Sequence, residues 1–331
     1  MPVLSIQEAK TLSMSILQKH GTSKENALSV TDSLLTAQIE GKLGHGFLRL
    51  LSYVSQLKTK KIDGRVKPSC EAILGSILRV DAKHGFAYPA IDLAITHSIE
   101  MAKKNGVAIS SVANSHHAGM LGYFSEKIAK LGYMSIIFSN SPQAMAPWGG
   151  TKAVFGTNPI AFATPRKNNP PLVIDMSLSK VARGKILASS KGDNVIPQGW
   201  ALDSNGEPTT NAKEALKGVL LPIGEEKGSA LCMMIEIFTA CLSGSNIGCE
   251  ASSLLDDQGV APSISQCLLV FDQNAISQKA FENRLEDLCQ YVLEQEGTRL
   301  PGDKKSSLYD LAKQDGVEIQ DEIYKDLMQL L

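Results

Sequence analysis

A histidine and an arginine stand four positions apart in the segment Gly44-His45-Gly46-Phe47-Leu48-Arg49. If this segment is helical, the two side chains lie on one face, about one turn apart. The imidazole of His45 would titrate near neutral pH, and the guanidinium of Arg49 would fit a carboxylate with two hydrogen bonds. Such a pair suits an enzyme that reduces a small 2-oxo or 2-imino acid. The alternative is a solvent-exposed helix on which Arg49 pairs with an acidic neighbour and His45 has no role.

The composition excludes several classes of partner. Of the 331 residues, 43% are hydrophobic and 20% are charged, and the formal net charge is -1. A chain of this length exceeds one typical core, so we expect two or three interlocked subdomains. The charge balance does not favour nucleic acid or an anionic membrane as a partner, and the apolar runs are too short to span a bilayer. The N-terminal residues lack the pattern of a signal peptide, so we expect a cytoplasmic protein.

The histidines limit where acid–base chemistry can occur, because all six of them lie in the first 117 residues. The candidates are His45, His84, His116 and His117. The pair His116-His117 does not indicate a zinc site, since adjacent side chains point apart and no further histidine stands at ligand spacing. The six cysteines form no C-x-x-C pair and are expected to be small apolar fillers, so we predict no metal site.

Apolar periodicity and turn residues predict an alternation of helices and strands. An apolar helix through Leu50, Tyr53 and Leu57 follows the His45 motif, and residues 186–223 are predicted to be rich in loops. A capping box at Thr22 and Glu25 is expected to begin the second helix. The other helices are expected over 5–20, 23–42, 88–104, 120–130, 227–242 (long and buried), 278–295 and 306–331, and the strands over 78–81, 107–112, 134–138, 160–163, 171–175 and 267–271. This order predicts an α/β or mixed α+β protein with interleaved subdomains.

Several segments have the residue types that bind phosphate or a dinucleotide, although the G-x-G-x-x-G fingerprint of a Rossmann fold is missing. Residues 115–119 join a strand to a helix N-terminus, where free N–H groups favour an anion. Asp175 and Ser177 end a buried strand, and Lys227 opens an apolar helix. Residues 299–305 place three cations around a rigid turn that would suit a 2′-phosphate. Ordinary turns, helix caps and solvated charges are the alternatives.

These segments, in this order, resemble the malate/L-lactate dehydrogenase-like family of NAD(P)H-dependent oxidoreductases, which lack a Rossmann fold. The resemblance covers nearly the whole chain. It is carried by Gly44-His45-Gly46-x-x-Arg49, Asn114-Ser115-x-His117, Phe155-Gly-Thr-Asn-Pro-Ile-Ala161, Ile174-Asp-Met-Ser177 with Arg183-Gly-Lys185, Pro197-x-Gly-Trp200 with Asp203-x-x-Gly206, and Leu221-Pro-x-Gly-x-x-Lys-Gly228. Within the family the chain is most similar to the Δ1-piperideine-2-carboxylate/Δ1-pyrroline-2-carboxylate reductases. That likeness rests on Asp81-x-x-x-Gly85-Phe86-Ala87-x-Pro89, the double histidine, the acidic stretch Glu250–Asp257 and the segment Arg299–Lys305.

The resemblance implies a central mixed sheet flanked by helices, and active sites completed across a homodimer. Residues 1–70 would form a helical region that carries the catalytic histidine, 71–300 would bind cofactor and substrate, and 301–331 would pack back on the N-terminal region. His45 would be the general acid, Arg49 the carboxylate clamp and Thr157 a substrate contact. NADPH, or alternatively NADH, would lie against His117, Ala118, Gly119, Met120, Leu121, Asp175, Met176, Ser177, Lys227, Arg299, Lys304 and Lys305.

The chain departs from the family pattern at three places. Gly44 replaces an orienting serine, Lys185 follows the keto-acid dehydrogenases, and Glu225-Glu226 replaces the usual glycine followed by histidine or an aromatic residue. The expected reaction is NADPH-dependent reduction of Δ1-pyrroline-2-carboxylate, and of Δ1-piperideine-2-carboxylate, because a basic cyclic imine that arrives protonated depends less on an orienting serine. The alternatives are a 2-hydroxy-acid dehydrogenase acting on malate, lactate or ureidoglycolate, and a non-catalytic NAD(P)-binding protein.

Overall fold

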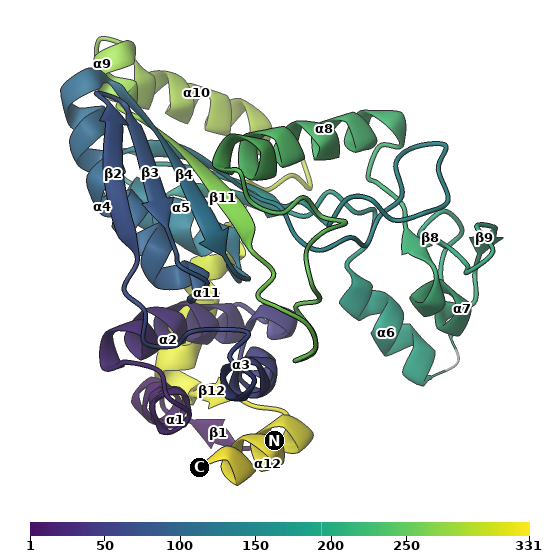
Figure 1. Ribbon diagram of the computed structural model, residues 1–331. Coiled ribbons are helices and arrows are strands. Elements are labelled where there is room, and N and C mark those ends of the chain that lie inside the picture. The colour runs from purple at the N-terminus through teal and green to yellow at the C-terminus, as the bar shows by residue number, and fades with distance from the viewer. Residues whose placement is uncertain (193) are drawn as a thin grey trace.

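The central sheet has seven strands in the order β2-β3-β4-β11-β5-β6-β7, and a small lobe projects to one side of it (Figure 1). The computed structural model describes residues 1–192 and 194–331, with only the backbone of residues 304 and 306. Strands β3 and β4 run parallel and the other neighbours run antiparallel, so the predicted mixed sheet is confirmed. The strands are β2 Ser69–Leu74, β3 Ile77–Asp81, β4 Val107–Ser115, β5 Met134–Ser139, β6 Ile160–Thr164, β7 Leu172–Met176 and β11 Ile264–Phe271.

Alternation along β11 divides the core between the two faces of the sheet. Leu268 packs in one buried cluster with helices α4 (Ala87–Asn105) and α5 (Leu121–Lys130). Its neighbour Cys267 packs in a second cluster with α8 (Glu226–Glu236) and the loops beside it. Successive strand residues point to opposite faces, so both faces of the sheet are covered.

The chain begins with an antiparallel helix pair, as predicted. Helix α1 spans Ile6–Lys19 and α2 spans Lys24–Ile39. The expected capping box at Thr22 and Glu25 is wrong, since the side chain of Ser23 caps α2 by accepting from the Asn26 N–H at 3.2 Å. Thr22 instead packs close to Gly64, where an added Cβ would lie 2.9 Å from the hydroxyl oxygen of Thr22.

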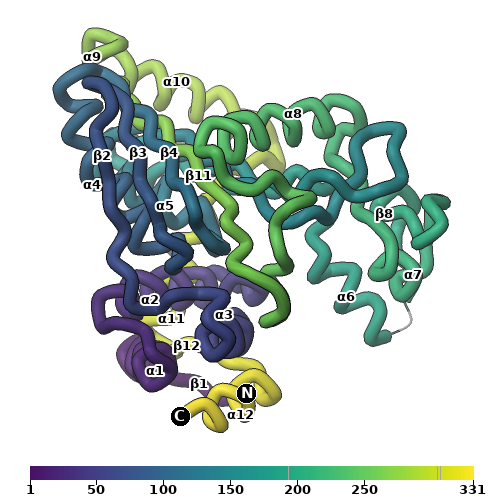
Figure 2. The backbone as a smooth tube through the Cα atoms, viewed as in Figure 1, coloured from purple at the N-terminus to yellow at the C-terminus, as the bar shows by residue number. Residues whose placement is uncertain are grey.

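The C-terminal segment packs against these helices. Strand β12 (Val317–Glu318) pairs with β1 (Val3–Leu4), and helices α11 (Lys304–Asp315) and α12 (Asp321–Leu330) flank it. Leu327 of α12 is fully buried in the cluster that α1 and α2 share. The two chain ends therefore lie side by side (Figure 2).

The segment predicted to be rich in loops forms most of the small lobe. Its elements are α6 Arg183–Lys191, β8 Ala201–Leu202, β9 Pro208–Thr209, α7 Ala212–Lys217 and β10 Val219–Leu220. The three strands form their own sheet, in the order β10-β8-β9. Strands of two residues are too short to give a periodic signal, which is why the prediction missed them.

The predicted helix over 227–242 is present, but it is neither a regular α-helix throughout nor fully buried. Helix α8 ends at Glu236 and continues as a π-helical turn over Ile237–Cys241. Met233, Ile237 and Leu242 on this segment are 55%, 51% and 54% exposed, so one apolar face has no cover within a single chain. The remaining helices are α9 (Gln273–Ile276) and α10 (Phe281–Leu293). Within residues 1–192 and 194–331, none of the helices has the length and hydropathy needed to cross a bilayer.

Candidate active site

His45 and Arg49 lie on either side of a helix break. A 3₁₀ turn over Leu43–His45 ends at the histidine, and Gly46 then changes the chain direction before α3 (Leu48–Lys58) begins. A Cβ at Gly46 would lie 2.4 Å from Gln38 Oε1 and 3.2 Å from Gln38 Cα, so a larger residue there would displace the Gln38 side chain. The continuous helix that would give the two residues a common face is therefore wrong.

Arg49 nevertheless folds back onto the turn that carries the histidine. Its Nε donates to the Gly44 carbonyl at 2.8 Å, and its Nη1 donates to the Leu254 carbonyl at 3.3 Å. A guanidinium has five N–H donors, so these two bonds orient it and leave others for a carboxylate. The partners described for Arg49 are carbonyl oxygens, not the acidic neighbour of the alternative interpretation.

The ring of His45 stacks on that of His117, with centroids 5.4 Å apart and an interplanar angle of 9°. Its Nδ1 is buried and has no hydrogen-bond partner within the described part of the chain. Burial, and then the charge of Arg49, lower the pKa of His45 to about 4, against the opposing influence of Asp175. The imidazole is therefore neutral at pH 7.

His117 is fixed by two buried tyrosines. The Tyr53 hydroxyl lies 2.7 Å from His117 Nδ1 and 2.8 Å from the Tyr88 hydroxyl. Burial holds the pKa of His117 well below its usual range, so this ring is neutral. Gly119, at φ +64°, passes close to Tyr88, and a Cβ there would lie 2.7 Å from the tyrosine oxygen. The segment between β4 and α5 is thus held in one conformation beside His45.

The end of β7 meets the start of α5. A Cβ on Gly122 would lie 2.8 Å from Asp175 Cβ, so the two elements are in close contact. Residues 117–121 lead into α5, whose first turn has no side-chain cap and so presents free N–H groups. Met176 is 44% exposed beside them, and the Ser177 hydroxyl lies 3.2 Å from that of Ser179. The predicted cofactor residues on β7 and before α5 are therefore brought together.

An ion-pair network connects this place with the C-terminal segment. Lys42 Nζ lies 3.3 Å from Asp175 and 3.6 Å from Glu40. Lys305 Nζ lies 3.2 Å from Glu40 and 3.4 Å from Glu126. Lys305 is thus near the site but paired with two acids. Arg299 is exposed, and the side chain of Lys304 lies outside the described residues.

Thr157 is positioned by a buried carboxylate that the sequence analysis missed. Asn158 follows it at φ +34°, and its side-chain amide donates to Glu236 at 3.1 Å. Asn140 donates to the other oxygen of Glu236 at 3.1 Å, and burial raises the pKa of this carboxyl. An acidic residue within an apolar helix was the signal that would have found it. Ser141 Oγ also accepts from the Thr157 N–H at 3.0 Å.

Lys227 lies apart from these residues. It is exposed at the start of α8, and no contact described for this chain joins it to His45.

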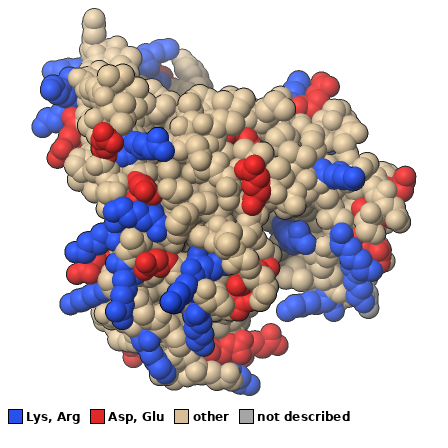
Figure 3. Space-filling view, in the orientation of Figure 1, with Lys and Arg blue, Asp and Glu red and all other residues tan. Residues whose placement is uncertain are grey.

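Figure 3 shows Lys and Arg side chains gathered on the lobe, over α6 and α7, and a hollow between the lobe and the body that carries α2 and α3. Arg183, Lys185 and Lys191 belong to α6.

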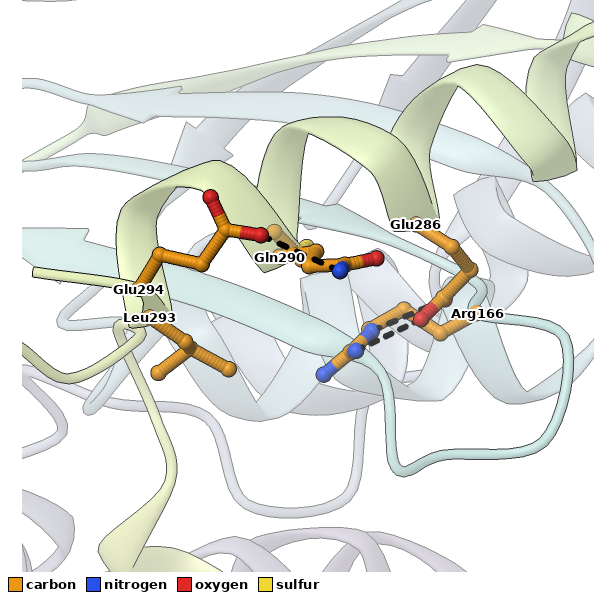
Figure 4. A pocket seen from close by; sticks show the side chains of 6 residues that line it. Arg166, Glu286, Gln290, Leu293 and Glu294 are labelled. Atoms are coloured by element: carbon orange, nitrogen blue, oxygen red, sulfur yellow. Dashed lines mark hydrogen bonds and ion pairs between the residues drawn. The ribbon is translucent and has the colours of Figure 1, made fainter.

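The hollow drawn in Figure 4 is a different place. It lies along α10 and contains none of the predicted site residues. Arg166 binds Glu286 there with two hydrogen bonds of 3.0 and 2.7 Å, so its guanidinium is already occupied. In the described residues, no three His, Cys, Asp or Glu side chains come together as a metal site would require.

Acid stability tests the burial of His116, whose two ring nitrogens have no described partner. Burial, and then Lys61, lower its pKa to about 3, below the unfolded value. Below pH 6.5 the unfolded chain binds a proton on this histidine and the folded chain does not. The free energy of unfolding therefore falls as pH falls, by up to about 1.4 kcal/mol per pH unit. We expect His116→Leu to reduce the loss of unfolding free energy between pH 6.5 and 5, measured in urea. The same substitution at the partly exposed His97 is the control, and parallel curves for wild type and His116→Leu would contradict the expectation.

A histidine and an arginine lie close to a helix N-terminus in this fold. The match to a protein family shows that the chain is an oxidoreductase. The model of the family described as "Malate/L-lactate dehydrogenase" matches residues 4–328, and the chain belongs to this family. The predicted family membership and the predicted fold are therefore confirmed.

Relatives and solved structures agree with this assignment. The chain is 42% identical to a (2R)-3-sulfolactate dehydrogenase (NADP(+)) of Chromohalobacter salexigens, over 92% of this chain and 91% of that protein. It is 33% identical to a Δ1-pyrroline-2-carboxylate/Δ1-piperideine-2-carboxylate reductase of Pseudomonas aeruginosa, over 99% of both. The structure of Δ1-piperideine-2-carboxylate reductase from Pseudomonas syringae superposes with a TM-score of 0.94 at 33% identity, over 100% of both chains. The sulfolactate dehydrogenase of Methanocaldococcus jannaschii gives 0.91 at 28% identity, over 99% of this chain and 96% of that one.

Gly44 is a further point to test, because the neighbouring His45 Nδ1 lacks a described partner. No described atom lies within 4 Å of the place that a Cβ on Gly44 would take, so a serine fits. We expect Gly44→Ser to raise kcat on a 2-oxo acid by about fivefold, if its hydroxyl gives the imidazole a hydrogen bond of about 1 kcal/mol. Gly44→Ala adds the Cβ without the hydroxyl and is expected to leave kcat unchanged. Equal rates for the two variants would refute the orienting role.

Proposed function

We propose that this chain catalyses the NADPH-dependent reduction of Δ1-pyrroline-2-carboxylate to L-proline, and of Δ1-piperideine-2-carboxylate to L-pipecolate. The observation that carries the proposal is the position of Arg49, which two backbone carbonyls orient next to the turn that carries the His45 imidazole. Arg49 holds the carboxylate of the substrate. His45 lies beside the reacting carbon–nitrogen bond.

The state of His45 favours an imine over a ketone. With a pKa of about 4, its imidazole is a poor proton donor at neutral pH. A cyclic imine is basic and brings its own proton, whereas a ketone must receive one as the alkoxide forms. Several relatives named as pyrroline-2-carboxylate reductases, at 30–35% identity, support the same choice.

NADPH is the proposed cofactor, with NADH as the alternative. The uncapped first turn of α5 fits a phosphate, because its N–H groups and the helix dipole favour an anion. The bound cofactor supplies the hydride, and Asp175, Met176 and Ser177 would hold it from the facing strand. The name of the 42% identical relative, which includes NADP(+), supports this choice.

A second candidate is a 2-hydroxy-acid dehydrogenase that acts on 3-sulfolactate. Hydroxy acids are among the alternatives that the sequence indicates, although 3-sulfolactate is not one of those named above. The 42% identical relative supports it, and so do the cations of α6, which would attract a substrate with two negative charges. A neutral His45 would serve as the base that takes the hydroxyl proton.

A homodimer is also part of the proposal. The exposed apolar face of Met233, Ile237 and Leu242 would be covered by a second copy of the chain. Residues 1–70 would supply His45 and Arg49, residues 71–300 would bind the cofactor, and residues 301–331 would close the N-terminal region. The cytoplasmic location stays a prediction.

One substrate panel tests these proposals. The purified protein is offered Δ1-pyrroline-2-carboxylate, Δ1-piperideine-2-carboxylate, pyruvate and oxaloacetate with NADPH or NADH, and 3-sulfolactate, malate and lactate with NADP⁺. We expect the highest kcat/KM on Δ1-pyrroline-2-carboxylate with NADPH. Preference for 3-sulfolactate, with a rate that falls steeply as salt is added, would favour the second candidate. Binding of NADPH without turnover of any substrate would leave the non-catalytic alternative.

A further inference from the structure

Lys61 is a fully buried cation just beyond the end of α3. Its side chain has 0% exposure, and its Nζ donates to the carbonyls of Ser253 at 2.7 Å, Gln258 at 2.6 Å and Asp256 at 3.3 Å. An ammonium group has three N–H donors, so each of them has a carbonyl partner. The carboxylate of Asp256 lies 3.6 Å away and offsets the charge.

Removing a cation from water costs several kcal/mol, so a buried lysine with this set of partners needs a reason. The partners all belong to one loop, residues 253–258, which lies about 200 positions further along the chain. Ser55 and Gln56 of α3 hold the same loop, through bonds of 2.6 Å to the Asp257 side chain and 2.7 Å to the Asp256 carbonyl. The loop is therefore fixed to α3 around the Lys61 ammonium.

The same loop contacts the arginine of the site. The Leu254 carbonyl accepts from Arg49 Nη1 at 3.3 Å, and Leu254 itself is buried. This carbonyl lies between those of Ser253 and Asp256, which Lys61 binds. Because the described bonds of Arg49 go only to Gly44 and Leu254, the place of the loop sets the direction of the guanidinium.

We propose that Lys61 is a positioning residue for Arg49: it fixes loop 253–258 so that the Leu254 carbonyl holds the guanidinium ready for the substrate carboxylate. The proposal rests on the proposed function, in which Arg49 binds that carboxylate. Preorganisation of this kind lowers KM, since the arginine does not have to be ordered when the substrate binds.

The test compares Lys61→Met with Lys58→Met, which removes an exposed lysine from the end of α3. With the acid that the panel identifies as substrate, we expect Lys61→Met to raise KM by about tenfold and to change kcat by less than about twofold, as expected for a binding group that is misplaced but present. The KM for NADPH and both constants of Lys58→Met are expected to stay at wild-type values. Amide exchange of residues 253–258 should be faster in Lys61→Met.

A double-mutant cycle separates positioning from a general structural role. If Lys61 acts through Arg49, Lys61→Met should change KM by less than about twofold in an Arg49→Lys background. A tenfold effect that persists in this background, or a fall in kcat with KM unchanged, would overturn the proposal. If Arg49→Lys alone leaves KM unchanged, the proposed function of Arg49 fails, whereas the exchange rates still report whether Lys61 fixes the loop.

Ser55→Ala provides a second variant if Lys61→Met does not fold. It removes one bond to Asp257 and leaves the buried cation paired. We expect a smaller rise in KM, about threefold, with kcat unchanged and with faster exchange of the same loop. Faster exchange without any rise in KM would show that the loop does not control Arg49.

Discussion

Replacing His45 by asparagine is expected to lower kcat by about 10²–10⁴-fold on a 2-oxo acid, and by less than about tenfold on a cyclic imine. A ketone needs a proton on its oxygen as hydride arrives, and in the proposed function His45 supplies that proton. An iminium ion already carries its proton. The ratio of the two losses in kcat, both measured on His45→Asn, therefore shows whether the enzyme is adapted to reduce a carbon–oxygen or a carbon–nitrogen bond. Asparagine keeps a polar group of similar size, and His84→Asn provides the same change at a histidine outside the site.

The pH profile gives an independent measure of the same group. The pKa of His45 is lowered to about 4 by burial and by Arg49, so the protonated form declines as pH rises above about 4. For reduction of a 2-oxo acid, kcat/KM should therefore fall with rising pH. For oxidation of a hydroxy acid, in which the neutral imidazole accepts a proton, kcat/KM should be level above about pH 5. A profile that is the same in wild type and His45→Asn would exclude His45 as the titrating group.

The sequence predicted the family and the fold better than the geometry around His45 and Arg49. The order of the motifs allowed the family to be predicted, and with it the mixed sheet, because each block is a short local stretch of sequence. The break at Gly46 was not predicted, because this segment contacts another helix: Gln38 Oε1 accepts from the Phe47 N–H at 3.2 Å. The spacing predicted that His45 and Arg49 share one helix face. In the structure Arg49 instead donates to the carbonyl of Gly44, the residue before His45.

Long-range contacts account for most of what was missed. Glu236 binds Asn140 and Asn158, and Lys61 binds carbonyls of residues 253–258, across separations of about 80 to 200 residues. Lys61 has no periodic or motif signal, and the only signal of Glu236 is that it is an acidic residue within an apolar helix. Burial makes them informative, since a charged side chain is kept from water only where its partners are in place.

Arg49→Lys is expected to lower kcat/KM by about 1–3 kcal/mol, or about 5- to 150-fold, the scale of a charge-assisted hydrogen bond. Lysine keeps the positive charge but cannot bind the Gly44 and Leu254 carbonyls and also present two parallel donors to a carboxylate. Most of the loss should appear in KM, because the carboxylate is bound equally in the ground and transition states.

Arg65→Lys is the matched control, since Arg65 also donates from Nε to a carbonyl, that of Gly21, but on an exposed turn. Arg65→Lys should leave both kcat and KM unchanged.

The Arg49→Lys variant also separates the two candidate substrates. A substrate with one carboxylate depends on this single clamp, whereas a sulfonate would retain a second anchor on the cations of α6, so its KM should rise less. An unchanged kcat/KM on every substrate would remove Arg49 from the site, and with it the reason for a cation buried at Lys61.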